Sequence, residues 1–512
     1  MPAHPFRTLL LASSLCALAS AVDAAGAPPL PSAIAVTPAQ ARDDVRLAIA
    51  VAEAALPDLY WHQSPGEWDA AKARALAAAA GADEAMDVWT IVAQLMAHVG
   101  EGHLDVIPGD AAVAHQRATA RLLPLDLHWS REGVFISGVH GGAAGIPPGS
   151  RLLAINGEDA QALLAELVSL SARDGRIETG AMRECPGRCY AVLRQRARGD
   201  EAGFDLHYAT PAGESRRARV AAQPMRGRPP AAARERRIAS LQWLSPGVAY
   251  LDVPSFSNRV YREAGTTFAD VMRDLFGQVE QGGADRLVLD LRENGGGSEP
   301  NEAILFSYLV PEPLRRYRSV EARARTLSVA SPSGQVLVHE VYDAEEMRGQ
   351  QVLDGGRLSR LDRPPEGLTT HWTRAAPVYG GRLVVLAGGR TFSGGAELAA
   401  MLRHVRRARF VGEETGGTYE GNTSGYAWDV VLPHSGVNLG MPLLRFRFDW
   451  DADTPGRGVL PDCDVPPQVS EIGVQRDRAW RVARALVETD PAQPAACPDA
   501  GVLSAAADPA EP

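Results

Sequence analysis

The fold of this chain is decided by a strand that runs into a glycine cluster, LVLDLRENGGGS at residues 287–298. Its apolar run, 286–291, is typical of a strand buried on both faces of a sheet. A second junction of the same kind is LVVLAGGRTFSGGAE at residues 383–397, where we predict a strand over 382–387 and a helix over 395–405. The two junctions predict an α/β layer in which two buried strands end side by side.

The segments around these junctions extend the α/β pattern. We predict a strand over 248–253 and helices over 265–281 and 300–309. Together they predict an α/β domain over residues 238–488, followed by an Ala/Pro-rich tail, 489–512, whose composition favours disorder.

The N-terminal part of the mature chain is predicted to be helical. Apolar residues recur at helical spacing in three stretches, which begin near residue 38 and end near residue 99. The sequence Gly100-Glu101-Gly102-His103 then breaks the helix before a strand-like run. We therefore predict a helical cap over residues 38–115.

Between the cap and the α/β domain the pattern changes to short strands and turns. Residues 133–139 and 151–157 read as strands, separated by a Pro-Gly turn, and 161–170 reads as a helix. This order resembles a PDZ domain, a class that binds peptides as an added strand at a sheet edge. We predict a PDZ-like domain over 120–222, with peptide binding and a structural spacer as equal alternatives, and a linker over 225–237.

The chain begins with the pattern of a secretory signal. His4 and Arg7 precede an apolar stretch, and small residues at 22–24 suit signal cleavage, so we predict a signal peptide over 1–24 and an exported protein. No other stretch is apolar for long enough to span a membrane. The net charge of -10 argues against nucleic acid and anionic membranes as partners.

Four cysteines remain after removal of the predicted signal: Cys185, Cys189, Cys463 and Cys497. An exported compartment permits disulfides, and the short spacing of Cys185 and Cys189 favours a local bridge. A Cys463–Cys497 bridge would tie down the tail, although the sequence leaves connectivity open. No histidine lies close enough to the first pair to complete a zinc site, and no other metal or cofactor motif is present, so we predict no metal and no cofactor.

The second junction places Ser393 at the start of a helix between small residues. Backbone N–H groups are unpaired there, and the helix dipole favours negative charge. A serine nucleophile needs an exposed hydroxyl on a sharp turn and donors ready for the oxyanion, for which Gly394 and Gly295 or Gly296 are the candidates. The alternative is that Ser393 only caps the helix.

Four motifs in this half of the chain resemble the tail-specific (C-terminal processing) and tricorn-core family of serine peptidases. They are DLRENGGG at 290–297, TFSGGAE at 391–397, FVGEETGG at 410–417 and GVLPD at 458–462. The resemblance implies a crotonase-like α/β catalytic domain behind a helical cap and a PDZ-like domain. It also implies that Ser393 is the nucleophile and that Gly295 and Gly296 lie at the oxyanion site.

The base that activates the serine can be argued by exclusion. One branch of the family uses a lysine, but the matching position here is Thr418, and the only lysine of the chain is Lys72, in the cap. Arginine does not deprotonate in proteins, which leaves histidine. His103 is the candidate, because Gly-Glu-Gly-His resembles the motif that carries the base in the tricorn-like branch; the alternative is a surface-loop histidine.

The carboxylate that would orient the base is less well marked. The tricorn-like branch has a glutamate where this chain has Pro455. Asp453 and Asp451 are close by, and we place Asp453 first. Glu397, one helical turn after Ser393, is another carboxylate near the site, with helix stabilisation as its alternative role.

These observations predict an exported serine endopeptidase that acts on extended or unfolded polypeptides through an acyl-enzyme. Two alternatives stay open. The first is an esterase or other acyl hydrolase, since the same groups cleave esters. The second is a catalytically silent protein that binds a peptide or an apolar ligand, because fold alone does not establish activity. The oligomeric state and the physiological substrate are left open.

Overall fold

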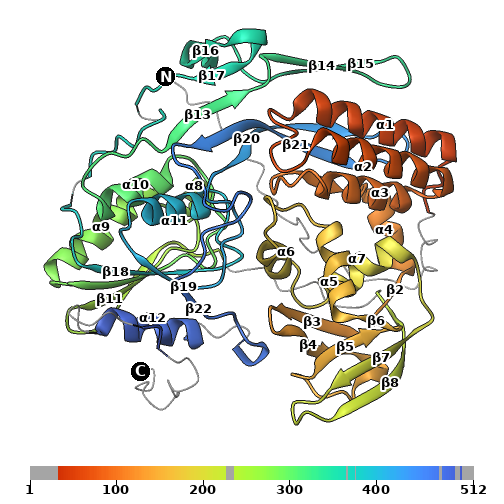
Figure 1. Ribbon diagram of the computed structural model, residues 1–512, viewed down its shortest axis with the longest axis horizontal. Coiled ribbons are helices and arrows are strands. Elements are labelled where there is room, and N and C mark those ends of the chain that lie inside the picture. The colour runs from red at the N-terminus through yellow and green to blue at the C-terminus, as the bar shows by residue number, and fades with distance from the viewer. Residues whose placement is uncertain are drawn as a thin grey trace, which may run out of the picture.

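The computed structural model describes residues 33–225, 236–364, 367–374, 376–471, 476–489 and 496–498. The chain is a mixed α/β protein with several sheets (Figure 1). The predicted signal peptide lies outside the described residues, as do most of the predicted linker and tail. No helix in the described part is long and apolar enough to cross a bilayer.

The N-terminal part consists of helices with strong start signals. The side chains of Thr37 and Ser64 each accept a hydrogen bond from the N–H of the residue three positions later. The side chain of that residue accepts one in turn from the N–H of Thr37 or Ser64. Proline occupies the first turn of both helices. The helices are α1 (Pro38–Ala55), α2 (Pro65–Ala78), α3 (Ala85–Ala97) and α4 (Asp110–Thr119). The apolar faces of α1 to α3 belong to the same continuous core as the α/β part, so these helices are anchored to it.

The β-rich part has an antiparallel sheet and a core of its own. Its strands are β3 (Leu125–Ser130), β4 (Gly133–Val139), β5 (Arg151–Ile155), β7 (Gly203–Ala209) and β8 (Ser215–Ala221), with β6 (Glu158–Asp159) beside β5. Its helices are α5 (Ala160–Ser169), α6 (Thr179–Glu184) and α7 (Cys189–Arg198). The short strands β2 (Arg121–Leu122) and β9 (Gln223–Pro224) pair and bring its two ends together.

A six-stranded sheet forms the centre of the α/β part. In spatial order its strands are β10 (Ser240–Ser245), β11 (Val248–Asp252), β12 (Arg286–Asp290), β18 (Arg382–Ala387), β19 (Arg409–Gly412) and β22 (Cys463–Asp464). Only β10 is antiparallel to its neighbour. Helices cover both faces: α8 (Asn258–Glu263), α9 (Phe268–Gln281), α10 (Asn301–Leu309) and α11 (Gly394–His404) on one, α12 (Arg478–Glu488) on the other (Figure 1).

Alternation along the strands explains why the central residues of β12 and β18 are all apolar. Leu287 and Leu289 join the core that contains α9 and α11, whereas Val288 joins the core under α12. Successive strand side chains point to opposite faces, so a strand covered on both sides must be apolar at every position.

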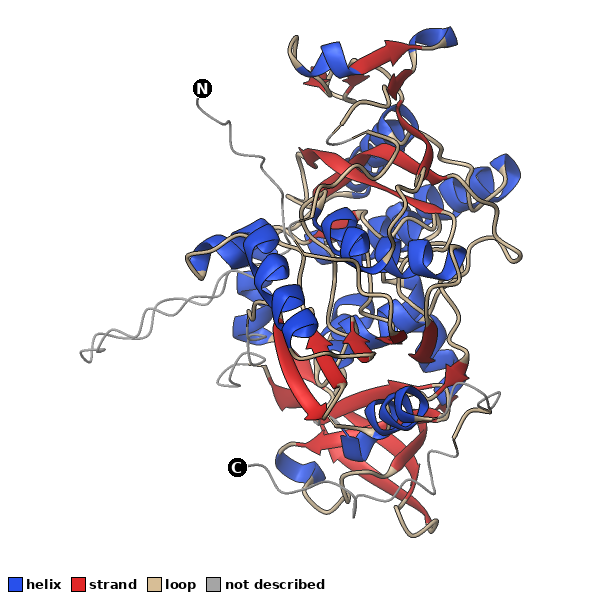
Figure 2. Ribbon diagram, turned by 90° about the vertical axis from the view of Figure 1, so that its left-hand side faces the viewer, coloured by secondary structure: helices blue, strands red, loops and turns tan. Residues whose placement is uncertain are grey.

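A second sheet was not predicted from the sequence. It contains β1 (Asp105–Ile107), β21 (Asn438–Phe448), β13 (Tyr317–Ala322), β17 (Leu358–Arg360) and β16 (Gln350–Val352), with β20 (Gly421–Val431) also paired to β21. The hairpin of β14 (Thr326–Ala330) and β15 (Val336–Glu340) lies near β16 and β17 at one end of the molecule (Figures 1 and 2). Pairing of β1 with β21 brings the turn that contains His103 to the α/β part.

Candidate active site

The two glycine-containing junctions lie side by side, as the sequence predicted. β12 and β18 are parallel neighbours in which Asp290 is level with Leu386. The loops that follow them are tied together, because the Phe392 N–H donates to the Asn294 carbonyl at 3.0 Å and the Thr391 hydroxyl donates to the Leu291 carbonyl at 2.8 Å. The loop before α11 is therefore held directly against the glycine cluster.

Ser393 occupies an unusual backbone conformation at the start of α11. Its φ of 50° and ψ of -129° lie outside the regions that non-glycine residues favour, and such conformations cost about 1–3 kcal/mol. Its side chain makes no capping hydrogen bond to the helix. The N-cap alternative is therefore wrong for the side chain, and Ser393 is partly exposed in this strained turn.

Gly296 packs against this turn more closely than any side chain would allow. A methyl group there would lie 2.7 Å from both the Ser393 Cβ and the Gly394 nitrogen, and the φ of Gly296 is +89°. Both constraints require glycine. The serine thus lies against the glycine cluster of the other junction.

The predicted oxyanion donors are not equally available. The Gly394 N–H opens α11 and has no acceptor within the helix. The Gly296 N–H donates to the Asn294 side-chain oxygen at 2.9 Å, and the Gly295 N–H donates to the Glu293 carbonyl at 3.2 Å. The structure therefore places all three glycines near Ser393, while leaving Gly394 as the donor without an acceptor in its own helix.

His103 lies beside the turn that carries Ser393. Its imidazole stacks on the ring of Phe392, the residue before Ser393, with ring centroids 4.6 Å apart. Both ring nitrogens are buried, and no described residue gives either of them a hydrogen bond. Burial lowers the pKa of His103 to about 4, which keeps the ring neutral at pH 7. His103 is thus a neighbour of Ser393 without being hydrogen-bonded to it.

The two carboxylates singled out in the sequence lie in different surroundings. Asp453 is exposed, and the described residues provide no bond between it and His103. Glu397 is buried, where it accepts hydrogen bonds from the hydroxyl of Tyr317 and from Arg316 at 3.1 Å. Burial raises the pKa of Glu397 to about 8, despite the opposing effect of Arg316. Glu397 therefore belongs to a buried charged network beneath α11.

Two buried carboxylates next to His103 were not identified as site residues from the sequence. Glu101 is 2% exposed, and Asp174, on the segment between α5 and α6, is 1% exposed. Asp174 accepts the N–H of Gly102 at 2.6 Å. Glu101 belongs to the quoted Gly-Glu-Gly-His motif, but nothing in the sequence around Asp174 marks it, because its contact with Gly102 is made only in the folded chain.

The β-rich part contacts the loops around Ser393 through α6. The Thr179 hydroxyl donates to the Glu414 carbonyl at 3.0 Å, and Arg183 forms a two-pronged ion pair with Glu413 at 2.6 and 2.9 Å. A methyl group on Gly389, four residues before Ser393, would lie 2.3 Å from the Thr179 carbonyl oxygen. Side chains and backbone of α6 thus support the loop that leads to the serine.

Comparison with known proteins identifies the α/β part. The sequence model of peptidase family S41 matches residues 247–465, which include both junctions and Ser393. The chain contains a serine-type peptidase domain of family S41. Because the family is one of peptidases, the match implies a peptide substrate. No curated protein matches the sequence.

Solved structures align with most of the chain, beyond the limits of this S41 match. Mature CPAF aligns with a TM-score of 0.59 and 16% identity, over 85% of this chain and 94% of that one. Mature CPAF complexed with lactacystin aligns with a TM-score of 0.58 and 15% identity, over 85% and 95%. The photosystem II D1 C-terminal processing protease aligns with a TM-score of 0.39 and 16% identity, over 85% and 94%. At these identities the CPAF structures show a shared fold.

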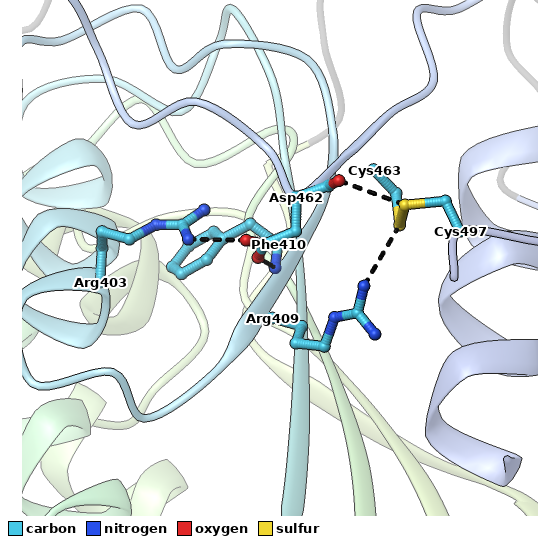
Figure 3. Close-up of a disulfide and its surroundings, with 6 residues drawn as sticks. All are labelled: Arg403, Arg409, Phe410, Asp462, Cys463 and Cys497. Atoms are coloured by element: carbon cyan, nitrogen blue, oxygen red, sulfur yellow. Dashed lines mark hydrogen bonds and ion pairs between the residues drawn. A yellow bond between two sulfur atoms is a disulfide. The ribbon is translucent and has the colours of Figure 1, made fainter. Parts of the chain in front are cut away.

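Two disulfides stabilise the edges of the structure. Cys185–Cys189 closes the turn before α7, as the sequence favoured. Cys463–Cys497 joins β22 of the S41 domain to the C-terminal segment, in the pairing that the sequence left open (Figure 3). Asp462, next to this bridge, accepts from Arg403 of α11 at 2.8 Å and so ties the edge strand to the helix that follows Ser393.

Among the described residues, no group of three or more His, Cys, Asp or Glu side chains is placed to hold a metal ion. The polar groups gathered at the two junctions are a hydroxyl, an imidazole, backbone N–H groups and buried carboxylates. That set is suited to attack by the hydroxyl on a carbonyl group.

Proposed function

We propose that this protein is an exported serine endopeptidase that hydrolyses peptide bonds of extended or unfolded polypeptides. The observation that carries the proposal is the position of Ser393, held in a strained turn at a strand-to-helix junction and packed against Gly296 of the neighbouring junction. A strained backbone conformation costs free energy and persists only where the surrounding structure holds it in place. Such conformations cluster at functional sites.

The chemistry assigns a role to each group. The Ser393 hydroxyl attacks the scissile carbonyl while His103 takes its proton, and His103 then returns the proton to the leaving amine. The Gly394 N–H stabilises the oxyanion, and the N–H groups of Gly295 or Gly296 join it if they leave their present acceptors. In the second half of the reaction His103 takes a proton from the water that attacks the acyl carbonyl, and then gives it to the Ser393 oxygen as the acyl bond breaks.

His103 must turn for this reaction. Its ring now stacks on Phe392 with both nitrogens unpaired, so the reaction requires a movement of the ring that brings one nitrogen to the Ser393 hydroxyl. Such a change is consistent with a ligand-free enzyme, in which catalytic hydrogen bonds are often long and tighten when substrate binds.

The remaining parts fit the same function. A parallel sheet with helices on both faces supports a crotonase-like reading of the S41 domain. The five-stranded path β3-β4-β5-β7-β8 with its own core supports a PDZ-like reading of the β-rich part, as a peptide-binding or a spacer domain. Two disulfides support an exported location, since oxidising compartments allow such bonds to persist.

A fluorophosphonate probe tests the proposal directly, because it reacts only with an activated serine. We expect the wild-type protein to be labelled at Ser393 and to cleave a reduced, unfolded protein, and we expect the Ser393→Ala variant to do neither. Absence of labelling in the wild-type protein would favour a silent binding protein. Labelling together with cleavage of a p-nitrophenyl ester, but of no polypeptide, would favour the esterase.

A further inference from the structure

We propose that Asp174, contributed by the β-rich part, is the carboxylate that positions His103 for catalysis. The proposal rests on the function proposed above and names the residue that orients its base. Asp174 acts through the Gly102–His103 turn, so it is a positioning residue and does not touch substrate.

The first support is a pair of hydrogen bonds that join the turn of Gly102 and His103 to the turn of Asp174 and Gly175. The Asp174 Oδ1 atom accepts the Gly102 N–H at 2.6 Å, and the Gly175 N–H donates to the Gly100 carbonyl at 2.8 Å. These bonds run in opposite directions between neighbouring residues of the two turns. The turn that presents His103 therefore takes its position from the turn that carries Asp174.

The second support is the position of the other carboxylate oxygen. A methyl group on Gly417 would lie 3.6 Å from Asp174 Oδ2 and 3.6 Å from the Ser393 nitrogen. A methyl group on Gly102 would lie 2.8 Å from Asp174 Oδ1 and 2.9 Å from the Phe392 ring. The carboxylate therefore lies against the histidine turn at Gly102 and close to Gly417, and both of these glycines also approach the turn that carries Ser393.

The third support is that the unpaired groups complement each other. Asp174 Oδ2 and both nitrogens of His103 are buried, and none of the three has a hydrogen-bond partner among the described residues. Leaving a buried polar atom unpaired costs free energy. Rotation of the imidazole away from Phe392 would let one nitrogen reach the Ser393 hydroxyl and the other the carboxylate.

The surrounding charges allow Asp174 to carry a negative charge during catalysis. Burial raises the pKa of Asp174 to about 7, while the hydrogen bond from the Gly102 N–H favours its charged form. Burial and the charge of Asp174 raise the pKa of Glu101 well above its usual value, so Glu101 keeps its proton when Asp174 ionises. Other charged or titratable groups around these turns include Asp58, His62, Arg173, Arg176 and Arg445.

Asp453, the exposed carboxylate, has none of these contacts. Its side chain is exposed and accepts no hydrogen bond from the described residues. It takes no part in the two hydrogen bonds that hold the turn of His103. Burial matters because an ion paired with an imidazolium is screened less when water is excluded.

The Asp174→Asn variant tests the proposal, because its amide oxygen can still accept the Gly102 N–H while the charge is lost. We expect kcat on a peptide substrate to fall about 10²-fold or more, with KM changed by less than about twofold. We also expect the acid limb of the kcat/KM profile to move to lower pH, because the limb no longer contains the ionisation of Asp174, whose pKa of about 7 lies above that of His103. A residue that only held the turn would leave this limb in place.

The control is Asp205→Asn, the same change on an exposed strand residue of the β-rich part, paired with Arg219 at 2.6 Å. We expect this control to match the wild-type protein in rate and pH profile. Gly102→Ala provides a second variant that displaces the Asp174 carboxylate from the other side, and circular dichroism establishes that each variant is folded. We expect folded Gly102→Ala protein to lose activity as well.

The failures can be told apart. If the wild-type Ser393 is not labelled by fluorophosphonate, the proposed function itself fails. If the wild-type protein is labelled but folded Asp174→Asn or Gly102→Ala protein keeps full activity and an unchanged pH profile, only the role of Asp174 is overturned. A loss of activity in Asp453→Asn without one in Asp174→Asn would also overturn it.

Discussion

The contact between the two junctions can be tested by adding a methyl group at Gly296. The new methyl would lie 2.7 Å from the Ser393 Cβ and 2.7 Å from the Gly394 nitrogen, at a position whose φ is +89°. Positive φ costs a non-glycine residue about 1–2 kcal/mol. Forcing atoms apart in a packed site costs a further 1–3 kcal/mol or so. We therefore expect Gly296→Ala to lower the free energy of unfolding by about 2–5 kcal/mol.

The same variant should be nearly inactive. Relief of the overlap requires a shift of the Ser393 turn, and a displacement of about 1 Å at a catalytic group can reduce the rate about 10²-fold. Gly283→Ala is the matched control, because Gly283 also has a positive φ, +63°, but faces open space. It should lose only about 1–2 kcal/mol and keep its activity.

The assays are urea denaturation and kcat/KM on a peptide substrate, measured on both variants and on the wild-type protein. The reasoning is refuted if Gly296→Ala is no less stable than Gly283→Ala and its kcat/KM stays within about twofold of the wild-type value.

The remaining predictions concern strain, charge, pH and cross-linking. Both Ser393→Ala and Ser393→Gly should be inactive. In urea denaturation the glycine variant should be more stable than the alanine variant by about 1 kcal/mol, because glycine adopts the backbone conformation of residue 393 without strain and this gain exceeds its entropic cost. Equal stability of the two variants would show that the backbone at residue 393 is not strained. Arg316→Met should cost about 3–5 kcal/mol in the same assay, since it leaves the buried carboxylates of its ion-pair network uncompensated, and a neutral result would contradict that network. Burial raises the pKa of Asp105 to about 6 from an ordinary value of 3.8, so its contribution to stability is lost as the pH rises through that window. Asp105→Asn should therefore match the wild-type protein near pH 4 and exceed it by up to about 3 kcal/mol above pH 6, and parallel stability curves would contradict the shift. Replacing Cys463 and Cys497 with alanine should lower stability by about 3–4 kcal/mol through loss of the cross-link, as a lower melting temperature would show; an unchanged melting temperature would mean that the packing of α12 alone holds this segment.

Local patterns in the sequence predicted much of the fold. The apolar strands β12 and β18 were predicted within a residue or two, because a strand covered on both faces must be apolar throughout. Helix α1 was predicted because its apolar residues recur at helical spacing. The Cys185–Cys189 bridge was predicted because its partners are four residues apart. In each case the pattern that supports the prediction lies within one short stretch of the sequence.

Contacts between distant segments could not be predicted in this way. The long pair β20 and β21 was missed, since the register of a sheet depends on which strands meet. The sequence drew attention to Glu397, but only the structure showed that its carboxylate is occupied by Arg316 and Tyr317. The sequence position of a helix residue predicts which face of the helix its side chain lies on. The residues that the side chain contacts depend on which other segment packs against that face.

The sequence by itself determined that a serine follows a buried strand and that a glycine cluster follows another, because strand burial and glycine conformation are local properties. Only the tertiary structure decided that Gly296 packs directly against the Ser393 turn, that Ser393 is strained, and that a carboxylate from the β-rich part lies against the turn of His103. The reason is physical: charge, burial and hydrogen bonding at a site depend on atoms brought together by folding, and residues such as Asp174 have no local pattern that reveals which atoms those will be.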